Sequence, residues 1–266
     1  MATLFRCDLI VRNALIFDGT GAPRQTGDVG VTGDRIIAVG DLGATSADVE
    51  IDAAGRAIAP GFIDAHTHDD RALLCGPDCL HCKLSQGVTT VVAGNCGSSA
   101  EDVSAAFTAI EAARPALNFA TLVGHNTVRR AVMGTENRQA TPDELRRMEA
   151  LVDRAMADGA VGFSSGLQYV PGTCAETAEL VALARVAGRR GGVYATHMRN
   201  EGTSLEEAVA EAINVAEQAQ CPLEISHLKV DAPSRWGASA RALAMIDEAR
   251  ARGARVNADP YLHDAA

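Results

Sequence analysis

The spacing of apolar residues changes near residue 56. Before that point, short apolar runs of β type are broken by Gly, Asp and Asn, a pattern typical of strands and turns. These runs are DLIVRNALIFDG (8–19), GDVGVTGDRIIAVG (27–40) and ADVEIDAAGRAIAP (47–60). We therefore predict a small N-terminal β-sheet domain over residues 1–56.

From residue 57 to residue 266, short apolar runs alternate with segments rich in Ala, Glu and Arg. Strands that alternate with helices indicate a parallel sheet, in either a doubly wound fold or a (β/α)8 barrel. One helix start is explicit, because Thr141, Pro142 and Glu144 form a capping-box sequence, and Gly159 supplies the stop. The seven apolar runs are AIAPGFIDAHTH, GVTTVVAGNCG, NFATLVGHN, AVGFSSGL, GVYATHMRN, PLEISHLK and ARVNADPY.

Composition narrows the class of protein. The 266 residues are 47% hydrophobic, as in a globular protein, and 24 basic against 34 acidic residues give a net charge of −10. An acidic chain is a poor partner for nucleic acid or an anionic membrane. No stretch approaches the roughly 20 apolar residues of a membrane span, and no signal peptide is seen. Seven cysteines in a chain of this kind suggest reduced thiols, so we expect a cytoplasmic protein.

Polar residues recur where the predicted strands end. The first strand ends in His66 and His68, and Cys96, His125, His197 and His227 follow four later ones. The C-terminal ends of barrel strands lie on one face, where active sites are found. Side chains far apart in sequence are therefore expected to meet around one pocket.

The chemistry of these residues favours a transition metal. Imidazole and thiolate are ligands for zinc rather than magnesium or calcium. Cys96, His197 and His227 would form a three-ligand site, and His66 and His68 can hold a second metal, with Cys96 as the bridge. Taken singly, a histidine at a strand end is more often hydrogen-bonded than bound to a metal. A buried cysteine likewise more often packs in the core than binds a metal.

The segments APGFIDAHTHDD, GVTTVVAGNCG, DGAVGFSSGLQYVPG, ATHMRNEG and ISHLK resemble the amidohydrolase superfamily, and within it the N-acyl-D-amino-acid deacylases, or D-aminoacylases. The resemblance implies a (β/α)8 TIM-type barrel. Many amidohydrolases bridge two metals with a carboxylated lysine at the end of strand 4. Here AVGFSSGL has no lysine, and the D-aminoacylase branch uses a cysteine from strand 2 instead.

The resemblance also implies roles for individual residues. Cys96, His197 and His227 would hold a tight zinc, and His66 and His68 a weaker second one. Lys229, Tyr169 and Tyr261 would contact the substrate near its carboxylate or scissile carbonyl, although the sequence around Tyr261 departs from the family's pattern. The alternative for Lys229 is a solvated surface amine, and the alternative for Tyr169 is an aromatic ring packed in a loop.

The implied reaction is zinc-dependent hydrolysis of the amide bond of an N-acyl-D-amino acid. Zinc lowers the pKa of bound water and polarises the acyl carbonyl, and a general base moves the proton to the leaving amine. In this superfamily that base is an aspartate after strand 8, which we do not find. Asp264 does not match it, and His263 is expected at the surface.

We therefore expect an incomplete barrel of about seven strands, with impaired turnover and self-association through its open edges. The catalytic residue is left unassigned. Two alternatives stay open: another amidohydrolase, of dihydroorotase or hydantoinase type, or a non-catalytic metal-binding fragment. For Arg199 and Glu201, near the pocket mouth, the alternatives are support of the metal ligands or surface salt pairing. His125 either lines the pocket or makes a loop hydrogen bond.

Overall fold

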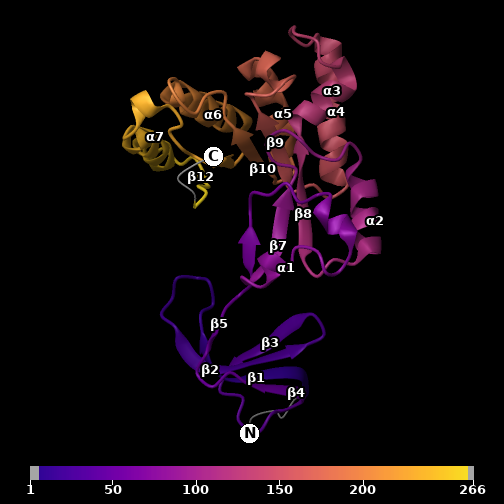
Figure 1. The fold of residues 1–266 in the computed structure, drawn as a ribbon, viewed down its shortest axis with the longest axis vertical. Coiled ribbons are helices and arrows are strands. Elements are labelled where there is room, and N and C mark those ends of the chain that lie inside the picture. The colour runs from indigo at the N-terminus through magenta and orange to yellow at the C-terminus, as the bar shows by residue number, and fades with distance from the viewer. Residues whose placement is uncertain (1–5, 263–266) are drawn as a thin grey trace. The chain divides into compact units, whose positions relative to one another are not determined.

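A computed structural model describes residues 6–262 of the chain. The chain separates into two compact units that divide after Gly61 (Figure 1). Each unit has its own sheet and its own buried apolar cluster.

The first unit contains a small β-sheet, as expected, but it extends to Gly61 and not only to residue 56, because β5 pairs with β1 of this sheet. Its five-stranded sheet runs in the order β3-β2-β1-β4, and β5 also pairs with β1. Strand β1 is antiparallel to β2 and parallel to β4, so the sheet is mixed. The strands are β1 (Arg6–Ile16), β2 (Gln25–Thr32), β3 (Arg35–Gly40), β4 (Ser46–Asp52) and β5 (Ala57–Ile58).

The second unit contains a seven-stranded sheet in the order β6-β7-β8-β9-β10-β11-β12. Every neighbouring pair is parallel, so the C-terminal ends of all seven strands lie on one rim. Within residues 6–262, β6 and β12 are the two ends of this sheet, which confirms the predicted incomplete barrel. The strands are β6 (Phe62–Asp64), β7 (Val88–Ala93), β8 (Asn118–Gly124), β9 (Gly162–Gly166), β10 (Val193–His197), β11 (Leu223–Ile225) and β12 (Val256–Ala258).

Helices connect these strands and run along the outside of the curved sheet (Figure 1). The predicted capping box is present at the start of α4, and Gly159 follows its end with φ +110°. The helices are α1 (His81–Leu84), α2 (Val103–Ala113), α3 (His125–Met133), α4 (Pro142–Ala157), α5 (Thr177–Arg189), α6 (Leu205–Ala219) and α7 (Ser239–Ala251). Three short 3₁₀ helices, Ala72–Cys75, Gly172–Cys174 and Pro233–Arg235, lie in the loops.

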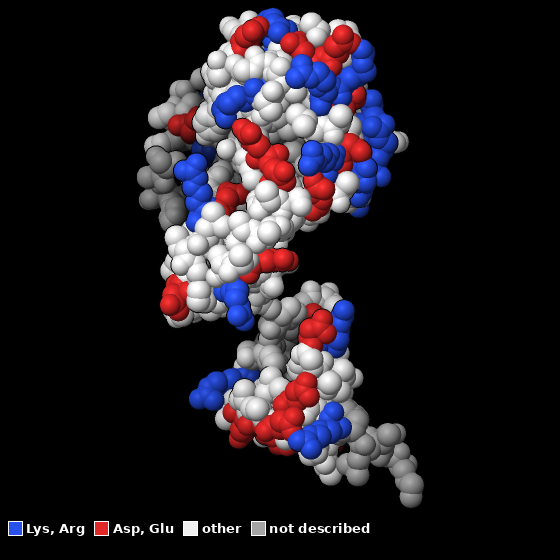
Figure 2. All heavy atoms as spheres, turned by 90° about the vertical axis from the view of Figure 1, so that its right-hand side faces the viewer, with Lys and Arg blue, Asp and Glu red and all other residues white. Residues whose placement is uncertain are grey.

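The main core lies between the helices and the outer face of the sheet. Leu180 and Leu183 of α5, Val209 of α6 and Leu223 of β11 are nearly inaccessible and belong to one apolar cluster. On the outer surface, acidic and basic side chains are interspersed over the helices (Figure 2). Between residues 6 and 262, no helix combines the length and the hydropathy needed to cross a bilayer.

A buried ionic network holds α3 against α5. The Arg129 guanidinium, which is fully buried, donates to the Glu179 carboxylate at 2.5 Å and to the backbone oxygen of Arg138 at 2.5 Å. The other carboxylate oxygen of Glu179 lies 2.8 Å from Nε2 of His125. Burial opposes ionisation of Glu179, but hydrogen bonds and charge from His125 and Arg129 lower its pKa. This network fixes the start of the helix that follows β8.

We expect Glu179→Ala to destabilise the chain by about 3–5 kcal/mol, because it leaves the guanidinium of Arg129 buried without its anion. Urea unfolding followed by circular dichroism measures this change. Glu207→Ala removes an exposed glutamate from α6 and should change stability by only about 0.5 kcal/mol. Equal effects of the two substitutions would contradict a structural role for the network.

Candidate metal centre

The loop after β7 places Cys96 at the rim of the sheet. The backbone turns sharply because Gly94, Cys96 and Gly97 all have positive φ, at +74°, +53° and +76°. A cysteine in this left-handed region is uncommon and needs support from its surroundings. That support comes from the buried Ser164 hydroxyl of β9, which donates to Gly94 O at 2.5 Å and accepts from Gly97 N at 3.0 Å.

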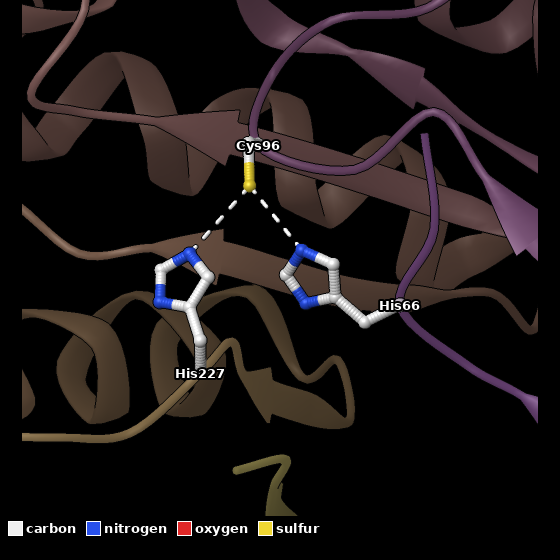
Figure 3. Close-up of side chains that lie close together, drawn as sticks. All are labelled: His66, Cys96 and His227. Atoms are coloured by element: carbon white, nitrogen blue, oxygen red, sulfur yellow. Dashed lines mark hydrogen bonds between the residues drawn. The ribbon is translucent and has the colours of Figure 1, made fainter. Parts of the chain in front are cut away.

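Imidazoles from three other segments surround the Cys96 thiol. Its sulfur lies 3.4 Å from Nε2 of His66 and 3.6 Å from Nε2 of His227, and both rings point toward it (Figure 3). The ring centroids of His197 and His227 are 4.5 Å apart, and those of His66 and His68 are 5.6 Å apart. The five residues expected from the sequence as metal ligands are thus gathered at one place.

The electrostatics of this cluster favour a thiolate. Burial disfavours the charged sulfur, but the nearby imidazoles of His197, His227, His66 and His68 lower the pKa of Cys96 to about 3. Burial likewise opposes the His66 imidazolium, yet its hydrogen bonds to Asp259 and Cys96 raise the pKa of His66 to about 10. The hydrogen bond to Cys96 also raises the pKa of His68.

Glu201 is buried behind the cluster. Its side chain is only 3% exposed, and its two oxygens lie 2.6 Å from Nδ1 of His227 and 2.5 Å from Nζ of Lys229. Burial opposes ionisation of Glu201, but these two partners lower its pKa. Of the two roles open for Glu201, the structure supports that of orienting a ligand histidine and excludes surface salt pairing. Arg199 instead pairs with Glu211, at 2.9 Å.

Asp259 is a functional candidate that the sequence reasoning missed. It follows β12, and its carboxylate accepts from the backbone N–H of His227 at 2.7 Å and lies 3.1 Å from Nδ1 of His66. It therefore steadies two of the imidazoles at once. The signal was available, because Asp259 stands at the end of the last predicted strand, at the position where other strands carry histidine or cysteine.

A cavity of about 410 Å³ opens over the cluster, a size that suits a small molecule. Tyr169 lines it, is 47% exposed, and places its hydroxyl 3.3 Å from Nδ1 of His197. Lys229 Nζ lies 5.4 Å from the centroid of the Tyr261 ring. The full lining is His68, Cys96, Ser98, Asn126, Arg130, Tyr169, Val170, His197 and His227.

The remaining positions singled out in the sequence are His125, the end of the fourth barrel strand, and the last residues of the chain. His125 makes neither of the contacts proposed for it: it begins α3, is fully buried, and bonds to Glu179 of α5 rather than to a loop or the cavity. Strand β9 ends in Ser165 and Gly166 and carries no lysine, as expected. His263 and Asp264 lie outside the described residues.

The donor set fits zinc. Ligand atoms of His66, Cys96 and His227 lie within 4.8 Å of one another, and so do those of His197, Glu201 and His227. Nε2 of His197 is buried and has no hydrogen-bond partner in the described part of the chain. A buried ring nitrogen without a partner is costly, and coordination to a metal would satisfy it. Thiolate and imidazole together are typical zinc ligands.

The fold and the rim chemistry define an α/β-barrel protein with its site at the C-terminal ends of the strands. The sequence model of the amidohydrolase family matches residues 49–263. The chain belongs to the amidohydrolase family.

Two similar curated relatives are named N-acyl-D-glutamate deacylase and D-aminoacylase. The chain is 44% identical to the N-acyl-D-glutamate deacylase of Alcaligenes xylosoxydans xylosoxydans and 39% identical to the D-aminoacylase of the same organism. Each alignment covers 96% of this chain and 57% of the relative. The chain thus spans little more than half the length of these curated relatives.

A solved structure shares the fold closely. The N-acyl-D-glutamate deacylase of Bordetella bronchiseptica, complexed with zinc and a phosphonate that mimics the tetrahedral intermediate, superposes with a TM-score of 0.92. The sequences are 42% identical, over 97% of this chain and 59% of that one. Metal binding is therefore a property of a structure that this chain resembles in detail.

In metal-free protein, we expect Cys96 to react rapidly with iodoacetamide at about pH 5. A thiol with a pKa of about 3 is ionised there, and the thiolate is the nucleophile. Cys221 is the internal control, since burial raises its pKa to about 11. Peptide mapping by mass spectrometry measures both rates. Labelling of Cys96 that begins only near the ordinary thiol pKa of about 8.5 would contradict the assigned ion cluster.

Proposed function

We propose that this chain carries the metal centre and part of the substrate pocket of a zinc-dependent N-acyl-D-amino-acid deacylase. The observation that supports the proposal most is the position of Cys96. Its sulfur comes from the loop after β7 and lies among imidazoles from the ends of β6, β10 and β11. In the D-aminoacylase branch that our sequence reasoning identified, a cysteine takes the place of the strand-4 lysine of other amidohydrolases.

Each ligand has an assigned place. Cys96, His197 and His227 would hold the tight zinc, and His66 and His68 would form a weaker second site, with Cys96 as a candidate shared ligand. When bound, zinc supplies Lewis-acid chemistry that polarises an amide carbonyl and acidifies water. Glu201 pairs with the His227 imidazole, and Asp259 pairs with that of His66 and accepts from the His227 backbone, as groups around metal ligands commonly do.

Substrate would be held by groups around the cluster, and of these Tyr169 lines the cavity. Lys229 donates to Glu201 and also lies within hydrogen-bond distance of His227, and its charge attracts the α-carboxylate of the amino acid. The hydroxyl of Tyr169, which sits on the cavity side of His197, donates to the scissile carbonyl. Tyr261 lies beside Lys229 and forms the wall next to the carboxylate.

We expect Cys96→Ala to lower the zinc content from about one tightly held ion per chain to well below that value, because it removes the only thiolate ligand. Mass-spectrometric metal analysis after dialysis measures the content. With cobalt in place of zinc, the sulfur-to-metal charge-transfer absorption should also vanish. Cys221→Ala, a buried cysteine on the path between α6 and β11, is the matched control and should keep both signals. Retention of the absorption in Cys96→Ala would overturn the assignment of the sulfur as a ligand.

Substrate class is tested by offering the zinc-loaded chain N-acetyl-D-glutamate, N-acetyl-D-methionine, hydantoin and dihydroorotate. We expect binding, measured by calorimetry, only for the two linear N-acyl-D-amino acids, since Lys229 needs a free carboxylate beside an open-chain amide. Any slow release of free amino acid is followed by mass spectrometry. Preference for the cyclic amides would favour the hydantoinase or dihydroorotase alternative, and binding of metal without any of these ligands would favour a non-catalytic metal-binding role.

A further inference from the structure

A cation of α3 faces the cavity over the metal-site cluster. Arg130 is an exposed residue of α3 that lines the cavity together with Cys96, His197 and Tyr169. It has no ion pair and no side-chain hydrogen bond within residues 6–262. The metal-site histidines and Lys229, by contrast, all have polar side chains beside them.

The helix itself directs Arg130 to the cavity. Residues four apart lie on one face of an α-helix, and Asn126, four residues before Arg130, also lines the cavity. Asn126 is fixed there by donating to the backbone oxygen of Gly166 at 3.2 Å. The neighbouring Arg129 points away and is buried against Glu179. The two adjacent arginines therefore differ in role: Arg129 is structural, and Arg130 faces the cavity.

The other charged groups of the site are paired with one another, so the charge of Arg130 is available to a ligand. Glu201 is balanced by Lys229 and His227, and Cys96 by the imidazoles around it. Lys229 follows β11, whereas Arg130 follows β8, and β9 and β10 lie between these strands. The two cations therefore stand apart on the rim, so a ligand that reaches both would carry two separated anions.

We propose that Arg130 binds the side-chain carboxylate of the substrate and selects acidic N-acyl-D-amino acids, those of glutamate type. This inference rests on the proposed function and assigns a specificity residue to it. Lys229 takes the α-carboxylate, and the planar guanidinium of Arg130 offers a fork of donors that matches the second carboxylate.

The test compares two ligands of the same shape, N-acetyl-D-glutamate and N-acetyl-D-glutamine, on the zinc-loaded 266-residue chain by calorimetry. The wild type should prefer the glutamate compound by about five-fold, the size of one exposed ion pair. Arg130→Gln should abolish this preference without weakening the glutamine compound. Arg130→Lys should keep part of it, because the charge remains but the fork is lost.

Arg147→Gln is the matched control, since it removes an exposed arginine from α4 and should leave the preference intact. Added salt should reduce the preference of the wild type and leave that of Arg130→Gln unchanged. If the preference survives in Arg130→Gln, or if the affinity for both ligands falls equally, the inference about Arg130 is overturned. The proposed function then still stands. Failure of the wild type to bind either ligand overturns the proposed function and the inference with it.

Discussion

The site depends on one interaction, the attraction between the Cys96 sulfur and the imidazoles around it. Taken alone, a buried thiolate is unfavourable, and so is a cluster of protonated rings. Together they stabilise each other, which is why the pKa of Cys96 falls to about 3 while that of His227 rises to about 9. A divalent metal fits the same geometry, because it provides the positive charge that the thiolate requires and accepts the ring nitrogens.

The rest of the second unit serves to hold that sulfur in place. Ser164 ties both sides of the loop that carries Cys96 to β9, and Gly166 allows that loop to approach, since an added Cβ would lie 2.1 Å from the backbone oxygen of Cys96. Asp259, after the last strand, reaches His66, after the first. The polar contacts at the rim thus link strands from both ends of the open sheet.

Much of this could be predicted from residue types and spacing. Alternating apolar and helical segments indicated a parallel sheet, the family resemblance indicated a barrel, and the capping box at Thr141 marked the start of α4. The metal-site candidates were found because each follows an apolar run. His125 satisfied the same rule, yet it is buried against Glu179, because β8 leads directly into α3 and the first helical turn rotates its ring away from the rim.

The sequence by itself determined the ligand chemistry, the parallel architecture and the resemblance to amidohydrolases, because these depend on residue type and periodicity. Only the tertiary structure decided which side chains share a partner. In the sequence, Glu201 is open to two roles, Asp259 shows only its place after the last strand, and Arg129 and Arg130 look equivalent. Their roles differ because burial and charge neighbours are set by contacts between distant strands, and local pattern carries no information about those contacts.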